Sequence, residues 1–255
     1  MNYGSISYDA AFSIMTLCVV AFYTGARLRA LIPEYMLGAD AIAAGRFVAL
    51  PLMLTTAIVM AMMLFTARSS FDDKQDLLSD MASNALQLDR MLTFYNTPKA
   101  SEAQEEYREY LQYVIANPSA IWELKDRTTA EKFAVDIQTL PVPANDKGAA
   151  KSSKEHMLDL MGKLSRDRFH LATKASRVIY PFSMTLLTLW LVAMFSFMGV
   201  TSPLLSGPSF WFSVLAAACV GSISFLIVEY TSSSAGFITL DMSPFDMVLR
   251  NIGGK

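Results

Sequence analysis

Four long runs of apolar residues constrain the fold of this chain more than any other feature, because they contain no charged side chain except Glu229 near the end of the fourth. A helix needs about 20 apolar residues to cross the hydrocarbon core of a bilayer. The sequence therefore predicts an all-α integral membrane protein with four spanning helices. These extend from Ala10 to Ala26, Phe47 to Ala67, Pro181 to Val200 and Phe210 to Tyr230.

The overall composition agrees with this prediction. Hydrophobic residues make up 53% of the chain and charged residues 17%, compared with about 25% charged residues in soluble domains. The net charge of −2 gives no basic surface for nucleic acid, so we expect no nucleic-acid partner. The expected partner is the lipid bilayer, and we place the chain in the inner (plasma) membrane of the cell as a multi-pass protein.

The segment between the second and third runs has a different character. Charged residues become dense between Arg68 and Ile179, and apolar residues fall to a helical spacing. This pattern predicts a helical, water-exposed insertion. The expected organisation is residues 1–67 for the first two spans, 68–179 for the insertion, 180–230 for a hairpin of the last two spans, and 231–255 for a tail with a short amphipathic helix.

Two local patterns predict details of the insertion. Ser101 and Gln104 have the spacing of a capping box at a helix start. The last helix of the insertion, from Ser153 to Val178, carries a heptad seam that includes Arg168 and is expected to continue into the third span. An arginine in such a seam must pair with an acid, reach solvent or face an oligomer axis. We favour a structural ion pair between Arg168 and Asp89.

Basic residues flank the spans on both sides of the membrane, with a small excess on the side of the insertion. The positive-inside rule then favours a cytoplasmic insertion. The flanking residues are Arg68, Lys74, Lys174 and Arg177 on the insertion side, and Arg27, Arg29 and Arg46 on the other.

The sequence contains no constellation of residues that an enzyme would need. His156 and His170 lie about four turns apart on one predicted helix, too far to share a metal. No phosphate-binding loop, dinucleotide-binding fingerprint or nucleophile elbow is present. We therefore expect no enzymatic activity, no catalytic residue, no bound metal and no cofactor.

The second run carries hydroxyl groups and flexible, polarizable methionine side chains among its aliphatic residues. These residues are Thr55, Thr56, Met60 and Met63. One interpretation is ordinary packing between helices. The other is a pore whose narrowest part is hydrophobic and gates by dewetting. These four residues are the pore-lining candidates.

Several motifs follow one another in an order that resembles a bacterial membrane family of unknown function, often described as bestrophin-like. The second run leads into a hallmark Ser-Ser-Phe-Asp stretch, and a Leu-Asp-Arg motif, a tyrosine and a Ser-Pro pair follow in order. The chain departs from the family at Asn96, where glycine is usual, and at residues 230–235, where the family has a second acid and Pro-Phe. The matching residues are Leu31-Ile32-Pro33-Glu34, Ala67-Arg68-Ser69-Ser70-Phe71-Asp72, Leu88-Asp89-Arg90, Tyr95, Arg168, Glu229, Gly236 and Ser243-Pro244.

The resemblance implies a function as well as a fold. Bestrophins are pentameric anion channels with four spans per subunit and helical cytosolic parts. The chain is therefore expected to form a homo-oligomer, with a pentamer implied, and to conduct anions such as chloride. Arg68 is the pore-mouth candidate, where its charge would attract anions.

A competing hypothesis belongs to another class of protein. The chain could be a non-conducting membrane-anchored scaffold or sensor whose helical insertion binds a protein partner. The absence of a filter-like motif from the sequence favours this alternative. In either case Ser243 to Ile252 is expected to form a short helix on the membrane or on the insertion.

Overall fold

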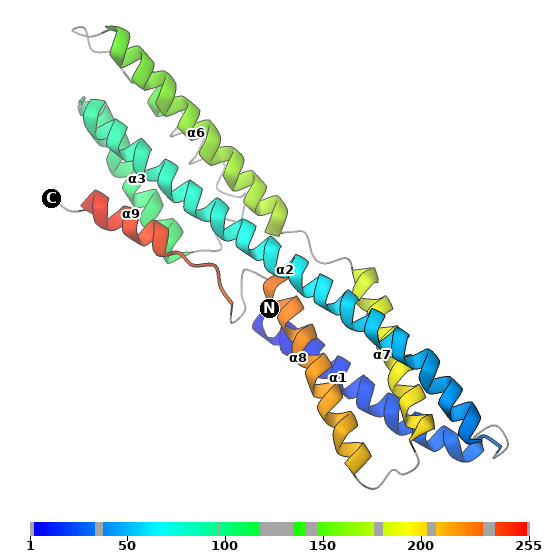
Figure 1. Cartoon of the computed structure of the whole chain (residues 1–255). Coiled ribbons are helices and arrows are strands. Elements are labelled where there is room, and N and C mark those ends of the chain that lie inside the picture. The colour runs from blue at the N-terminus through cyan, green and yellow to red at the C-terminus, as the bar shows by residue number, and fades with distance from the viewer. Residues whose placement is uncertain are drawn as a thin grey trace. The chain divides into compact units, whose positions relative to one another are not determined.

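The computed structural model describes residues 3–33, 38–95, 97–117, 135–140, 147–175, 181–202, 208–231 and 238–253. These residues are almost entirely helical and include no strand (Figure 1), which confirms the predicted all-α class. The elements are α1 (Tyr3–Leu28), the 3₁₀ turn η1 (Arg29–Leu31), α2 (Ala39–Tyr95), α3 (Pro98–Ala116), α6 (Lys147–Ala175), α7 (Pro181–Thr201), α8 (Pro208–Thr231) and α9 (Ser243–Gly253).

Four helices are long and apolar enough to cross a membrane, as the sequence predicted. Their candidate spans are Tyr8–Leu31, Asp40–Tyr95, Phe182–Thr201 and Phe210–Thr231. The second of these is much longer than a bilayer requires, because α2 is one continuous helix of 57 residues. It contains Pro51, and it begins at Ala39 rather than at Phe47.

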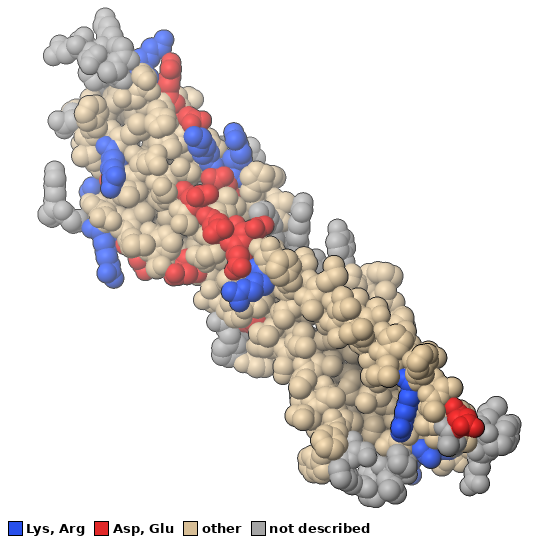
Figure 2. Space-filling model, viewed as in Figure 1, with Lys and Arg blue, Asp and Glu red and all other residues tan. Residues whose placement is uncertain are grey.

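The chain divides into two compact units. The membrane unit consists of Met1–Phe71 and Val178–Ile238, and the helical unit consists of Asp72–Arg177 and Thr239–Lys255. On the face drawn in Figure 2, charged side chains are dense over the helical unit and sparse over the membrane unit.

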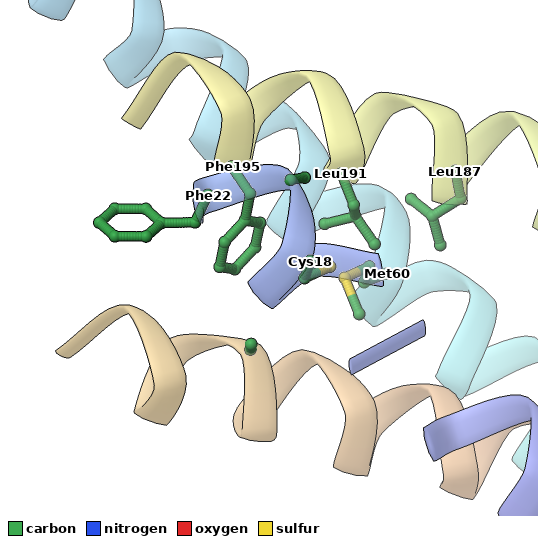
Figure 3. Close-up of a cluster of buried hydrophobic side chains, with 8 residues drawn as sticks. Cys18, Phe22, Met60, Leu187, Leu191 and Phe195 are labelled. Atoms are coloured by element: carbon green, nitrogen blue, oxygen red, sulfur yellow. The ribbon is translucent and has the colours of Figure 1, made fainter. Parts of the chain in front are cut away.

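The core of the membrane unit lies where α1, α2, α7 and α8 meet. Its buried side chains are apolar, and Figure 3 shows Cys18 of α1 and Met60 of α2 next to each other below Leu191 of α7, while the Phe22 ring extends to one side. Close backbone approach makes this packing possible, because a Cβ atom at Gly25 of α1 would lie 2.0 Å from the carbonyl oxygen of Ser196 in α7. The core residues are Cys18, Ala21, Phe22, Met60, Leu187, Leu191, Phe195 and Ala217.

Two arginines make side-chain hydrogen bonds at the end of the membrane unit where α1 and α7 end. The Arg29 guanidinium donates hydrogen bonds to the carbonyl oxygens of Val200 (3.3 Å) and Ser202 (3.1 Å). It therefore satisfies acceptors that the end of α7 leaves without helical partners. Arg27 donates to the Tyr23 hydroxyl at 2.6 and 3.0 Å and also lies over the Tyr23 ring.

The helical unit has its own core, built from apolar faces at helical spacing. The part of α2 beyond Phe71, α3 and α6 each bury such a face, and α9 contacts α3. Tyr95, one of the motif residues named in the sequence, belongs to this core and is 6% exposed. The core includes Leu78, Met81, Ala85, Leu88, Leu92, Tyr107, Leu111, Val114, Met157, Leu160, Leu171, Phe245, Val248 and Ile252.

The capping box predicted at Ser101 is wrong. α3 begins one turn earlier, with Thr97 as its N-cap and Pro98 in its first turn, and the Thr97 hydroxyl accepts from the backbone N–H of Ala100 at 3.2 Å. Proline suits this first turn because its missing N–H would have no helical partner there. The Gln104 side chain therefore turns to other acceptors. The predicted continuation of the last insertion helix into the third span falls on residues 176–180, outside the described residues.

Candidate functional site: the exposed face of α2 and the end of α8

The pore-lining candidates do not share one environment on α2. Met60 is 4% exposed and belongs to the core of the membrane unit, and Met63 packs against the same cluster. Thr56 is also buried, and its hydroxyl donates to the Leu52 carbonyl oxygen at 2.8 Å. Only Thr55 is exposed. Three of the four candidates thus face into the protomer, which is the packing role weighed above.

A second stripe of α2 points away from that core. At about 100° per residue, Thr55, Val59, Met62 and Thr66 fall on one side of the exposed surface of the helix. All four are exposed, and Met62 is 65% exposed. We call these four residues the Thr/Met stripe. The other side of the exposed surface is more bulky and apolar, with Phe47, Leu50, Leu54, Ile58 and Phe65.

The hydroxyl groups of the stripe donate within their own helix. Thr55 donates to the Pro51 carbonyl oxygen and Thr66 to the Met62 carbonyl oxygen, each at 2.8 Å. A hydroxyl that donates its hydrogen bond to a backbone carbonyl oxygen of its own helix presents mainly its oxygen lone pairs to the surroundings. The stripe is therefore soft and weakly polar, and its side chains carry no charge.

Arg68 follows the stripe along α2 but projects about 150° away from it around the helix, where it meets the end of α8. Its guanidinium donates to the Tyr230 hydroxyl at 3.2 Å and stands 5.7 Å from the centroid of the Tyr230 ring. Phe71 packs edge-on against the same ring, with centroids 5.7 Å apart. Tyr230 thus orients a cation that remains exposed at the surface.

Glu229, beside Tyr230, is fully buried. One carboxylate oxygen accepts the backbone N–H of Ile238 at 3.1 Å, and the other, Oε2, is buried without a hydrogen-bond partner among the described residues. The sequence shows Glu229 only as the one charged residue of the four apolar runs, near the end of the fourth. In the structure Glu229 instead binds the backbone of the segment that follows α8.

Asp89 in the helical unit binds residues of α3. It is 6% exposed, accepts a 2.7 Å hydrogen bond from the Gln104 side chain, and lies 3.8 Å from the Arg108 guanidinium. Gln104 also donates to the Thr93 hydroxyl at 2.7 Å, so this network joins α2 to α3. Arg168, predicted as the partner of Asp89, lies half-buried on α6. The ion pair between them stays a prediction.

Sequence reasoning missed two contributors to this region. Tyr230 enters the sequence prediction only as the last residue of the fourth run, and its contact with Arg68 joins residues 162 positions apart. Gln104 was assigned to a cap. A buried acid such as Asp89 needs a donor, and this requirement could have singled out Gln104. Among the residues that the structure describes, no group of three or more His, Cys, Asp or Glu side chains is arranged to hold a metal ion.

The fold and these surfaces define a four-span membrane protein with a helical insertion between its second and third spans. The family profile of the Bestrophin-like domain matches residues 15–245, and the chain belongs to this bestrophin-like family. No curated protein and no solved structure matches the chain.

Proposed function

We propose that the chain is one subunit of an oligomeric membrane ion channel whose conducting path is lined by the Thr/Met stripe of α2. The observation that carries this proposal is that α2 exposes a soft, weakly polar stripe in a span that a lone protomer would turn toward lipid. Side chains fill the core of the membrane unit, so a path would need several copies around an axis, such as the pentamer of bestrophins.

The stripe suits a hydrophobic constriction. Val59 and Met62 supply apolar surface, and Thr55 and Thr66 supply hydroxyl oxygens on either side along the helix. A narrow apolar ring can exclude water and so close a path, while selectivity is set elsewhere. Of the original pore-lining candidates, Thr55 keeps this role. Thr56, Met60 and Met63 are assigned to packing that supports the helix.

In this proposal Arg68 contributes a preference for anions through its charge at the level of one mouth, and not as a residue of the stripe. Its guanidinium is permanently charged, exposed and oriented by Tyr230. In a ring of subunits the charge is repeated around the axis, which concentrates anions such as chloride at one mouth of the path. We place this mouth and the helical insertion on the cytoplasmic side of the inner membrane, from the excess of basic residues there.

Two methionines of α2 provide the central test. Met62→Ala widens the proposed constriction and should raise single-channel conductance in planar bilayers by about twofold or more, with little effect on stability. Met60→Ala instead opens a cavity in the core and should lower stability by roughly 2 kcal/mol. This is the low end of the usual range, since the unfolded side chain stays in lipid.

The outcome separates the two functions considered for the chain. Purified wild-type protein that forms a ring by native mass spectrometry and carries ion flux in liposomes supports the channel. Absence of flux from a stable monomer or dimer would reject it in favour of the scaffold or sensor. Equal conductance in Met62→Ala and wild type would show that another surface lines the path.

A further inference from the structure

A shallow, open groove lies along one face of the first turns of α2, at the end of the membrane unit opposite to Arg68. It has a volume of about 540 Å³. Phe47 is 79% exposed and Leu50 66% exposed, so the groove presents apolar surface to its surroundings. Arg46 is its one charged lining residue among those that the structure describes. The lining residues are Ile42, Ala43, Arg46, Phe47 and Leu50.

The position of Arg46 along α2 sets its depth in a bilayer. Arg46 and Arg68 bracket the uncharged run 47–67 within one continuous helix. At 1.5 Å per residue they are about 33 Å apart along the helix axis, close to the roughly 30 Å thickness of the hydrocarbon core. With Arg68 at one boundary, Arg46 lies at the level of the phosphate groups at the other.

Arg46 differs from the other arginines on its side of the membrane unit. Arg27 is bound to Tyr23, and Arg29 caps α7. Arg46 is exposed and makes no hydrogen bond or ion pair with any described residue. Asp40, the acid nearest to it within α2, lies almost two turns earlier and projects about 120° away around the helix. Among the described residues, a guanidinium at this depth therefore has no anionic partner and is available to an anion such as a lipid phosphate.

We propose that this groove binds an anionic phospholipid. The Arg46 guanidinium forms charge-assisted hydrogen bonds to the lipid phosphate, and an acyl chain lies over Phe47 and Leu50. The described lining offers no acidic side chain to the amine of a zwitterionic headgroup. The site thus favours lipids with net negative charge, such as phosphatidylglycerol or cardiolipin.

Native mass spectrometry of the purified full chain tests this site without any requirement for conduction. The protein in mild detergent is titrated with phosphatidylglycerol and, separately, with phosphatidylcholine. Arg46→Gln should weaken retention of phosphatidylglycerol about fivefold, as expected for the loss of one basic contact, and Arg46→Lys should restore part of it. Arg27→Gln is the matched control, since it removes a charge on the same side that is already bound to Tyr23.

A second variant tests the apolar half of the groove. Leu50→Trp fills the groove but keeps Arg46, and it should reduce retention of both lipids. Three results would overturn the proposal: equal retention of the two lipids by wild type, an equal loss in Arg27→Gln and Arg46→Gln, or a changed subunit count in Arg46→Gln with lipid retention unchanged. The last result would make the groove a contact between subunits.

Discussion

Gly199 of α7 lies directly against the backbone of Phe22 in α1, so that a Cβ atom at position 199 would stand 2.1 Å from the Phe22 carbonyl oxygen. Gly25 makes the reciprocal approach to Ser196. Both partners at each contact are backbone atoms, which cannot rotate away as a side chain can. The packing of α1 against α7 therefore depends on glycine at these two positions.

Gly199→Ala should destabilise the membrane unit by about 2 kcal/mol or more, because the new methyl group forces α7 away from α1. Gly162→Ala in α6 is the matched control, since a Cβ there has no neighbour within 4 Å. It should be neutral or stabilising by up to about 1 kcal/mol through helix propensity. Thermal unfolding in detergent compares the two variants, and similar losses in both would rule out the backbone contact as the cause.

Gln104→Ala should cost about 1–3 kcal/mol of stability in the helical unit, because it leaves the buried Asp89 carboxylate without its 2.7 Å donor. Arg108→Ala should cost less than about 1 kcal/mol, since that guanidinium is 3.8 Å away and its side chain is a third exposed. Hydrogen exchange of the α3 amides reports both effects. A larger effect for Arg108→Ala would show that charge pairing dominates at Asp89.

Tyr107 should make the helical unit sensitive to alkaline pH. Burial raises the pKa of the Tyr107 hydroxyl, and the nearby Tyr110 and Asp89 raise it further. A raised pKa in the folded state means that full stability is present below the unfolded value of about 10 and is lost as the pH rises above it. Tyr107→Phe should flatten stability between pH 9 and about 11. Tyr113→Phe, at an exposed position, is the control and should leave the change of stability with pH as in wild type. Equal pH profiles in wild type and Tyr107→Phe would contradict the assignment of this pH dependence to Tyr107.

Gln75→Ala should release the segment that leads into α9. The Gln75 amide pairs with the backbone of Asp241 in both directions, donating to its carbonyl oxygen (3.0 Å) and accepting from its N–H (2.8 Å). Loss of both bonds should speed hydrogen exchange of the Asp241 amide about five- to tenfold. Gln87→Ala, on an exposed position of α2, is the control. An Asp241 amide that keeps its protection would mean that packing of α9 on α3 alone holds the segment.

The spans could be predicted from the sequence because a charge inside a bilayer is costly enough to mark where each span ends. The same reasoning could not find the start of α2 at Ala39, because Asp40 and Arg46 interrupt its hydropathy while leaving helix formation intact. The cap at Thr97 did have a signal in the Pro98 that follows it. The Ser101–Gln104 spacing competed with that signal, and only the acceptors at Asp89 and Thr93 explain the position of the Gln104 side chain.

Less of the candidate site could be predicted, for two physical reasons. A helical period places Thr55, Thr56, Met60 and Met63 around α2, but it does not say which face meets α1 and α7. The environments of Arg68 and Glu229 depend on contacts with Tyr230 and Ile238. A motif can include such residues without indicating that one is exposed and oriented and the other fully buried.

The bond from Arg29 to Val200 has a consequence for how the protein is made. A further 171 residues must be synthesised after Arg29 before Val200 exists, which takes roughly 10–30 s at 5–20 residues per second. During that interval the face of α1 that carries Phe22 and Gly25 has no α7 to pack against. We therefore expect the packing of α1 against α7 to form only after the helical insertion has been translated.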